Sequence, residues 1–153
     1  MTERVLKIER IIKAAPPRIW RCITEPKLLE QWFCPKPWYV KDVIYDLRIG
    51  GKGSFKICGP NGEEFPNLGV FLAVEPNKRL VSTDAFVDAW IPSDNAFMVS
   101  ETILEDLGNG TTKYTAMARH WTDEAVENHV KMGFDQGWGT AADQLEELLL
   151  SDF

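Results

Sequence analysis

The sequence predicts an α+β fold in which one antiparallel sheet is covered by a long C-terminal helix. Three observations support this class: a β-rich stretch over about residues 38–119, Gly- and Asn-rich turns that interrupt it, and helical periodicity from Thr122 to Leu150. An antiparallel sheet needs its apolar face covered, and only this last segment is long enough to cover it. The chain has 153 residues and is expected to form a single domain over residues 1–153.

Two short helices are expected after a first strand. Residues 5–13 alternate β-branched and charged side chains, as a strand does, and Pro16-Pro17 ends them. Proline is tolerated in a first helical turn, and the apolar residues that follow recur at helical spacing: Ile19, Trp20 and Ile23. A second helix is expected to start at Thr24-Glu25-Pro26 and to carry Leu28, Leu29 and Trp32.

Six further strands are expected before the C-terminal helix, separated by turns. The Asn-Gly pairs within the turns supply the positive φ that tight hairpins need, most clearly at Gly108-Asn109-Gly110. The expected strands cover residues 38–47, 54–58, 68–75, 79–87, 97–107 and 111–119.

The C-terminal segment is predicted to be one helix capped by Thr122, with Asp123 and Glu124 at the positive end of its dipole. Gly133 and Gly137 fall on its apolar stripe. A glycine inside a helix costs about 1 kcal/mol relative to alanine, so two of them facing inward indicate close approach or open space. The apolar residues of the stripe are Val126, Val130, Phe134, Ala141, Leu145 and Leu148.

Composition excludes several classes of protein. The net charge of −6 argues against a nucleic-acid partner. No apolar run is long enough to insert in a membrane, and the charged N-terminus is unlike a signal peptide, which favours a cytoplasmic protein. The three cysteines and two histidines show no metal-ligand spacing, so no metal, no cofactor and no disulfide is expected. Six Trp, eight Phe and three Tyr are more rings than a small core needs.

Several short strings occur in a specific order along almost the whole chain. They include Ala15-Pro16-Pro17 with Ile19-Trp20, Gly69-Val70-Phe71, Thr83-Asp84-Ala85-Phe86, Arg119-His120-Trp121 and Gly137-Trp138-Gly139. Together they resemble the START-like (SRPBCC) helix-grip superfamily, in its branch named after the activator of the heat-shock-protein-90 ATPase and the calicheamicin-resistance-like, or polyketide-cyclase-like, subgroup. The resemblance implies a curved sheet of about six or seven strands wrapped around the C-terminal helix, with a cavity between them. Function is not implied, because a fold hosts many functions.

The residues are compatible with such a cavity. Gly133 and Gly137 remove volume from the helix, and Ala116 and Ala118 remove it from a strand. Ligand pockets are mostly apolar with a few placed polar groups. The alternative interpretation is that the rings simply fill the core. The candidate ligand-binding residues are Trp38, Phe55, Phe71, Asp84, Phe86, Trp90, Met98, Arg119, His129, Phe134 and Trp138.

Two of the candidates are charged. Strand alternation that keeps Leu80 and Phe86 inward also turns Asp84 inward, and a buried carboxylate must be paired or protonated. Arg119 is one candidate partner, and Asp84 is either a ligand anchor, a member of a structural ion pair or a residue of the cavity rim. His129 is expected on the flank of the C-terminal helix, where it either reaches a pocket mouth or is a hydrogen-bonded or solvent-facing histidine. No nucleophile motif accompanies either histidine.

Three functions remain open at this point. The first is a module that binds a small hydrophobic or aromatic molecule. The second is a pocket enzyme of the cyclase, dehydratase or hydrolase type, with Asp84, Arg119 or His129 as acid, base or anchor. The third is a chaperone-interacting protein, although that role in the family uses a larger protein with an additional N-terminal domain. The sequence also leaves a homodimer open.

Overall fold

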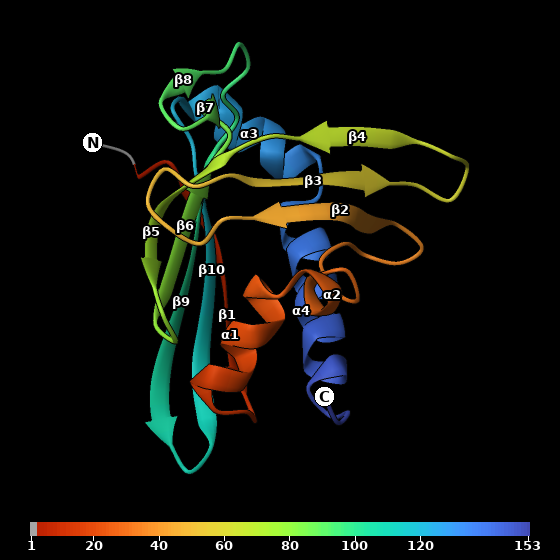
Figure 1. The fold of residues 1–153 in the computed structure, drawn as a ribbon, viewed down its shortest axis with the longest axis vertical. Coiled ribbons are helices and arrows are strands. Elements are labelled where there is room, and N and C mark those ends of the chain that lie inside the picture. The colour runs from red at the N-terminus through yellow and green to blue at the C-terminus, as the bar shows by residue number, and fades with distance from the viewer. Residues whose placement is uncertain (1–2) are drawn as a thin grey trace.

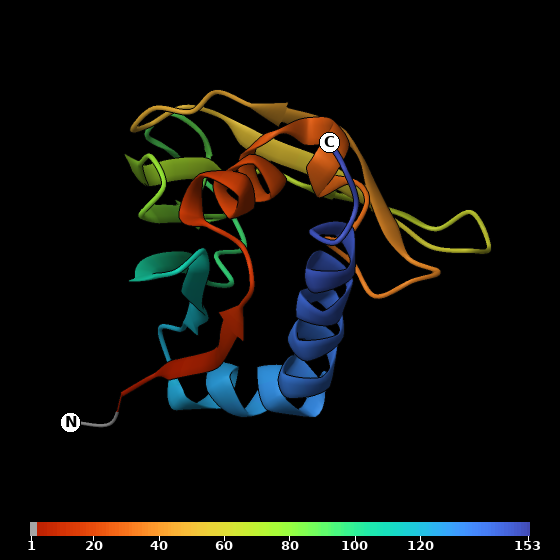
Figure 2. The same cartoon turned by 90° about the horizontal axis from the view of Figure 1, so that it is seen from below.

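The computed structural model describes residues 3–153 as a curved antiparallel sheet that wraps around the C-terminal helix (Figures 1 and 2). The predicted α+β class with a helix-grip arrangement is confirmed. Among the described residues, no helix has both the length and the apolar character needed to cross a membrane. The elements in chain order are β1 (Val5–Ile12), α1 (Pro16–Thr24), α2 (Pro26–Leu29), β2 (Tyr39–Tyr45), β3 (Gly53–Cys58), β4 (Glu64–Asn67), β5 (Val70–Glu75), β6 (Arg79–Thr83), β7 (Phe86–Asp88), β8 (Ile91–Pro92), β9 (Val99–Gly108), β10 (Thr111–Arg119), α3 (Asp123–Lys131) and α4 (Phe134–Leu148).

The sheet consists of two parts that meet where β3 begins. One part has the strand order β1-β10-β9-β6-β5, and the other has the order β2-β3-β4. A bridge between Lys52 and Val70 and a hydrogen bond from the Gly53 amide to the Gly69 carbonyl (2.9 Å) connect the two parts. A Cβ at Gly69 would lie 2.5 Å from the Thr83 carbonyl oxygen, so this junction requires glycine. With β4 and β5 counted as one interrupted strand, the sheet has seven strands, within the expected six or seven.

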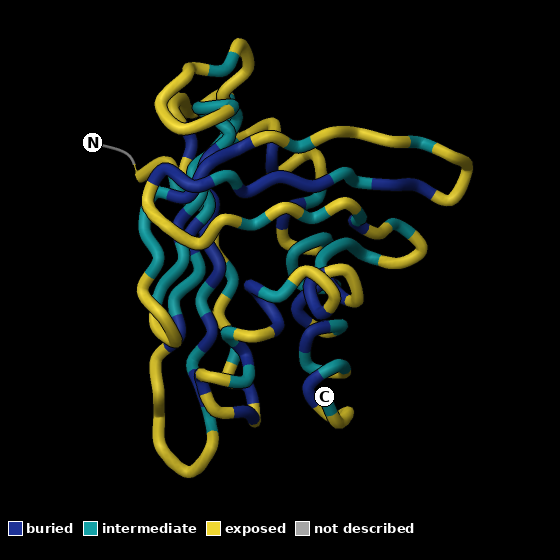
Figure 3. Tube along the Cα trace, viewed as in Figure 1, coloured by how far each residue is buried: buried dark blue, intermediate teal, exposed yellow. Residues whose placement is uncertain are grey.

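The solid core lies between α1, α2, the C-terminal part of α4 and the adjoining ends of β1, β9 and β10. Figure 3 shows buried residues concentrated where these elements face one another. The Trp32 indole N–H donates to the Cys22 carbonyl at 2.8 Å, which fixes the chain after α2 onto α1. The largest fully buried side chains of this cluster are Ile12, Ile19, Cys22, Leu29 and Leu145.

The single C-terminal helix predicted from the sequence is wrong: two helices, α3 and α4, replace it. Figure 2 shows them running in different directions. Gly133 lies between them with φ of +93°, a conformation that side chains with a Cβ rarely adopt, so it ends one helix and starts the next. The Thr122 cap is confirmed, because its hydroxyl accepts a hydrogen bond from the Ala125 amide at 3.0 Å.

The strands also differ from the prediction in several places. The expected strand over residues 79–87 ends at Thr83, and residues 86–88 pair with β8 in a separate hairpin. Strand β4 was not predicted; it contains Pro66, which lowers the strand signal but is accepted at a sheet edge. Strand β9 begins at Val99, two residues later than the predicted start at residue 97.

Candidate functional site

A cavity of about 400 Å³ lies between the inner face of the sheet and α4. This volume is within the range of about 300–1,000 Å³ that small-molecule pockets occupy. Its wall takes residues from α1, α2, α4 and most strands of the curved sheet. The rings in the wall are Trp32, Phe33, Tyr45, Phe55, Phe71, Phe97, Tyr114 and Trp138.

The register of the sheet explains why space remains on this side. Ser82 of β6 pairs with Ser100 of β9, and Thr102 of β9 pairs with Ala116 of β10, so four small side chains line the cavity in two neighbouring rows. On the opposite wall, a Cβ built on Gly137 would meet no atom within 4 Å. Small residues therefore face each other across the gap, and the larger rings enclose it from the sides.

Aromatic contacts hold the apolar wall in place. Phe33 and Phe55 contact edge to face at a centroid distance of 5.2 Å, and Tyr45 and Phe71 do so at 5.0 Å. Such geometry contributes about 0.5–1.5 kcal/mol per pair beyond the area buried. These contacts fix the orientation of the rings, so the rings do not turn into the cavity and fill it.

Asp84 lines the cavity at the end of β6. One carboxylate oxygen, Oδ1, accepts hydrogen bonds from the amides of Phe97 (2.8 Å) and Met98 (3.1 Å). The predicted pairing with Arg119 is wrong. Successive strand residues point to opposite faces, and Arg119 lies on the outer face of the sheet, where its guanidinium donates to Glu101 at 3.2 Å.

Glu101 is the centre of an ion-pair network on that outer face. It is 6% exposed and also accepts from Arg79 at 2.7 Å. Burial raises the pKa of Glu101, but the hydrogen bonds from Arg79 and Arg119 outweigh burial, and the net pKa lies below its usual range. Arg119 is therefore occupied in a structural ion pair, away from the cavity.

Two histidines form a buried pair next to the cavity. Nε2 of His120 and Nδ1 of His129 are 2.8 Å apart, and Nδ1 of His120 lies 2.9 Å from the Phe97 carbonyl. A carbonyl can only accept, so Nδ1 of His120 carries the proton, and in the uncharged pair its Nε2 accepts from His129. Burial, together with the nearby charge of His120, lowers the pKa of His129 to about 4.

The histidine pair itself was not predicted. Of the alternatives for His129, the structure shows the hydrogen-bonded histidine rather than one at a pocket mouth or facing solvent. His129 is 6% exposed, and its ring contacts Phe97 and Trp138, two residues of the cavity wall, at centroid distances of 4.9 Å and 6.0 Å. The pairing requires α3 to fold back over the end of β10. That turn lies at residues 120–122, before α3 begins, and it is a tertiary arrangement that the periodicity of the chain does not encode.

The structure brings together only some of the candidate residues. Phe134 packs against His129 at 5.1 Å behind the wall. Trp38 stacks on Phe65 outside the cavity, and Phe86 packs on Trp90 in the β7–β8 hairpin. The candidates that line the cavity are Phe55, Phe71, Asp84, Met98 and Trp138. Those that do not line it are Trp38, Phe86, Trp90, Arg119, His129 and Phe134.

The predicted pair of inward glycines is half correct. Gly137 lines the cavity, whereas Gly133 forms the junction between the helices. The polar lining residues Ser82, Ser100 and Thr102 were not singled out, although their alternation along β6 and β9 is a signal that could have found them.

Cys34 is the thiol in the cavity wall. Burial raises the pKa of Cys34 to about 11, so the thiol is protonated near neutral pH and is a weak nucleophile. Burial raises the pKa of Cys22 to about 11 as well, in the core beneath α1. Both thiols act as small packing groups.

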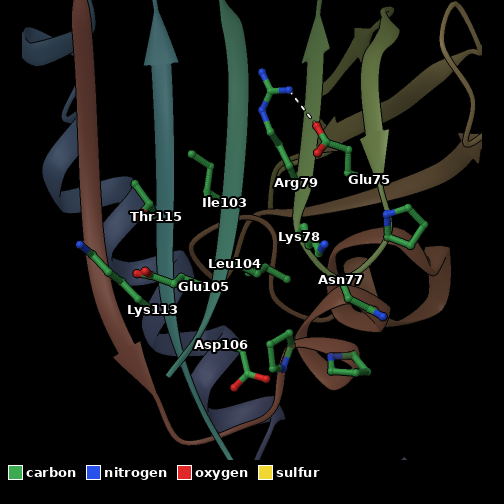
Figure 4. A pocket seen from close by; sticks show the side chains of 13 residues that line it. Glu75, Asn77, Lys78, Arg79, Ile103, Leu104, Glu105, Asp106, Lys113 and Thr115 are labelled. Carbon is green, nitrogen blue, oxygen red and sulfur yellow. Dashed lines mark hydrogen bonds and ion pairs between the residues drawn. The ribbon is translucent and has the colours of Figure 1, made fainter. Parts of the chain in front are cut away.

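A second, open groove of about 800 Å³ lies near the start of α1 and extends over β9 and β10 (Figure 4). Charged side chains of both signs line it, including the ion pair between Arg79 and Glu75 at 2.9 Å. Exposed charges of this kind are screened by salt, and Arg79 is already paired with Glu75. The inner cavity is therefore the better candidate for a specific site.

Comparison with known proteins supports the fold. The family model described as "Activator of Hsp90 ATPase homolog 1-like protein" matches residues 13–150. A crystal structure of a protein from Nitrosomonas europaea is 42% identical, with 97% of this chain and 96% of that chain covered and a TM-score of 0.91. A protein from Mycobacterium smegmatis is 25% identical, with 99% and 93% covered and a TM-score of 0.80. An NMR structure from Arthrobacter aurescens, 24% identical over 96% and 86% with a TM-score of 0.83, shows the same fold. No curated protein matches.

Proposed function

The chain belongs to the Activator of Hsp90 ATPase homolog 1-like family, and on that premise we propose that it encloses a small hydrophobic or aromatic molecule in the cavity between the sheet and α4. The observation that carries the proposal is the open space of about 400 Å³ beside a tightly filled core in the same molecule. Well-packed interiors leave few voids larger than a water molecule.

The composition of the wall supports an apolar ligand. Eight rings and several aliphatic side chains face the cavity. Burial of apolar ligand surface against them contributes about 25 cal/mol per Å². Because edge-to-face contacts such as Phe33 with Phe55 already order the rings, binding costs little additional side-chain entropy.

The same wall favours binding over acid–base catalysis. Among the lining residues, Asp84 is the only Asp, Glu, Lys, Arg or His. The His120–His129 pair touches the wall from behind without lining the cavity. General acid–base chemistry needs a proton donor or acceptor positioned within reach of the reacting atom. The cavity offers one such group, the Asp84 carboxylate, and one of its oxygens already accepts from two amides.

Tryptophan fluorescence tests the proposal, because Trp32 and Trp138 line the cavity and Trp90 lies outside it. A panel of neutral aromatic compounds of naphthalene size is titrated into the protein. We expect saturable quenching by some members, retained in Trp90→Phe and reduced in Trp138→Phe. The proposal fails if no compound quenches and the protein purified from its native host shows no ligand density in the cavity.

A chaperone partner is the alternative that the family description brings forward. A pulldown with a heat-shock-protein-90-type chaperone, combined with its ATPase assay, separates the two. Stimulation of the ATPase by Trp138→Phe as well as by the wild-type protein would favour the chaperone role, because that surface activity would not depend on the cavity.

A further inference from the structure

We propose that the ligand of this cavity carries a protonated amine, and that the free oxygen of the Asp84 carboxylate binds it. The inference rests on the proposed function and adds the chemical class of the ligand. Three features carry it: the half-used carboxylate, a row of unpartnered hydroxyl groups beside it, and the absence of any cationic side chain from the wall.

The Asp84 carboxylate is held in place with one oxygen to spare. Its Oδ1 accepts from the amides of Phe97 and Met98, at 2.8 and 3.1 Å. Within residues 3–153, Oδ2 accepts no hydrogen bond and Asp84 forms no ion pair. Two amide donors on one oxygen hold the group in place, and because Asp84 lines the cavity, Oδ2 remains available to a ligand there.

Three hydroxyl groups extend this polar site along the inner face of the sheet. Ser82 lies two residues before Asp84, and it pairs with Ser100 of β9, two residues before Thr102. All three residues line the cavity, and their hydroxyls make no hydrogen bond to any other residue that the structure describes. These hydroxyls are therefore free to donate to, or accept from, a polar edge of a ligand in the cavity.

The charge of the site selects a cation. No Lys, Arg or His lines the cavity, and the whole chain carries a net charge of −6. A carboxylate ligand would bring a second negative charge next to Asp84 with no cation to offset it. An ammonium group offers three donors, enough for Oδ2 and two hydroxyl oxygens, and charge-assisted hydrogen bonds are about twice as strong as neutral ones.

Three probes on one apolar skeleton test the proposal: 1-naphthylmethylamine, 1-naphthalenemethanol and 1-naphthoic acid. Their dissociation constants are measured by calorimetry near neutral pH. The amine is expected to bind about tenfold or more tighter than the alcohol, since charge-assisted hydrogen bonds are about twice as strong as neutral ones. The acid is expected to bind more weakly than the alcohol.

Asp84→Asn isolates the charge, because the amide oxygen still accepts from the Phe97 and Met98 amides. The matched control is Asp88→Asn, which removes an exposed carboxylate from β7 outside the cavity. We expect Asp84→Asn to abolish the preference for the amine while it leaves the affinity for the alcohol within about threefold, and Asp88→Asn to change neither. Thermal denaturation confirms that both variants fold.

The outcomes separate this inference from the proposed function. Binding of the alcohol with no preference for the amine, a preference for the acid, or an amine preference that survives Asp84→Asn would overturn the amine proposal alone. Binding of none of the three probes would count against the cavity as a ligand site, and therefore against the proposed function as well.

Discussion

The two halves of α4 face the same sheet, but one half packs in the solid core and the other borders the cavity. Gly137, Ala141 and Leu145 are spaced four residues apart and so lie on one face of the helix. Leu145 is fully buried in the solid core, whereas Gly137 borders the open cavity. Along this face the side chains grow from none at Gly137 to a large one at Leu145. The space between helix and sheet is therefore filled at Leu145 and left open at Gly137.

The sheet shows the same gradient. Leu104 of β9 lies in the solid core and pairs with Tyr114 of β10, which also lines the cavity, and the row two residues on pairs Thr102 with Ala116. The next row pairs Ser100 with Ala118. The cavity does not need a special backbone: the small residues Gly137, Ser100 and Thr102 leave room at one end, whereas Leu145 and Leu104 fill the other. Along β9 the side chains also change in polarity: Leu104 in the core is apolar, whereas Thr102 and Ser100 at the cavity carry hydroxyl groups.

The largest expected effect is on the filled half. Leu145→Ala removes a fully buried side chain from a packed region, which typically costs about 2–5 kcal/mol because the cavity left behind collapses only in part. Urea denaturation measures the loss. A loss below about 1 kcal/mol would mean that this half is as loosely packed as the other.

The half of the molecule that borders the cavity should lose stability in acid, because the His120–His129 pair lies beside it. The unfolded His129 imidazole binds a proton below about pH 6.5, whereas the folded one, with its pKa lowered to about 4, does not bind a proton until the pH is much lower. The unfolded state holds more protons in this window, so the free energy of unfolding falls as pH falls from about 6.5 to 4, by about 2–3 kcal/mol from this group.

The control for the acid effect is His129→Gln, which cannot titrate. Denaturation curves at several pH values compare the variant with the wild-type protein. The slope of stability against pH should be shallower in the variant between about pH 4 and 6.5. Equal slopes in the two proteins would show that His129 is not held uncharged by its burial beside His120.

The smallest effect expected is a gain. A Cβ at Gly137 meets no atom within 4 Å, so Gly137→Ala should raise the free energy of unfolding by about 1 kcal/mol through helix propensity alone. Gly133→Ala should do the reverse, because its φ of +93° is strained for any residue with a Cβ. Thermal unfolding of both variants provides the measurement. Destabilisation by Gly137→Ala would mean that the helix and sheet are already in contact there.

The sequence was informative where periodicity and local chemistry decide the outcome. The α+β class, the order of strands and helices, and the Thr122 cap follow from such signals. The division of the last helix did not, because the apolar stripe continues through Gly133 and only the backbone conformation reveals the break. Strand β4 was hidden by Pro66.

The site was predictable in part for the same reason. Alternation along β6 turned Asp84 inward correctly, and Gly137 was identified as a source of space. Arg119 was misplaced because partner choice between two nearby strands depends on which face each residue occupies. The His120–His129 pair and the seating of Trp38 on Phe65 depend on tertiary contacts that no local pattern encodes.

Calorimetry with 1-naphthalenemethanol on the wild-type protein, Gly137→Leu and Gly139→Leu tests the central claim most directly. Leucine at 137 would occupy the open space, whereas a Cβ at Gly139 points to Arg10, outside the cavity. The account predicts one bound molecule per chain in the wild-type protein and in Gly139→Leu, and none in Gly137→Leu, which should remain folded. Equal binding by all three proteins would contradict a ligand site between the sheet and α4.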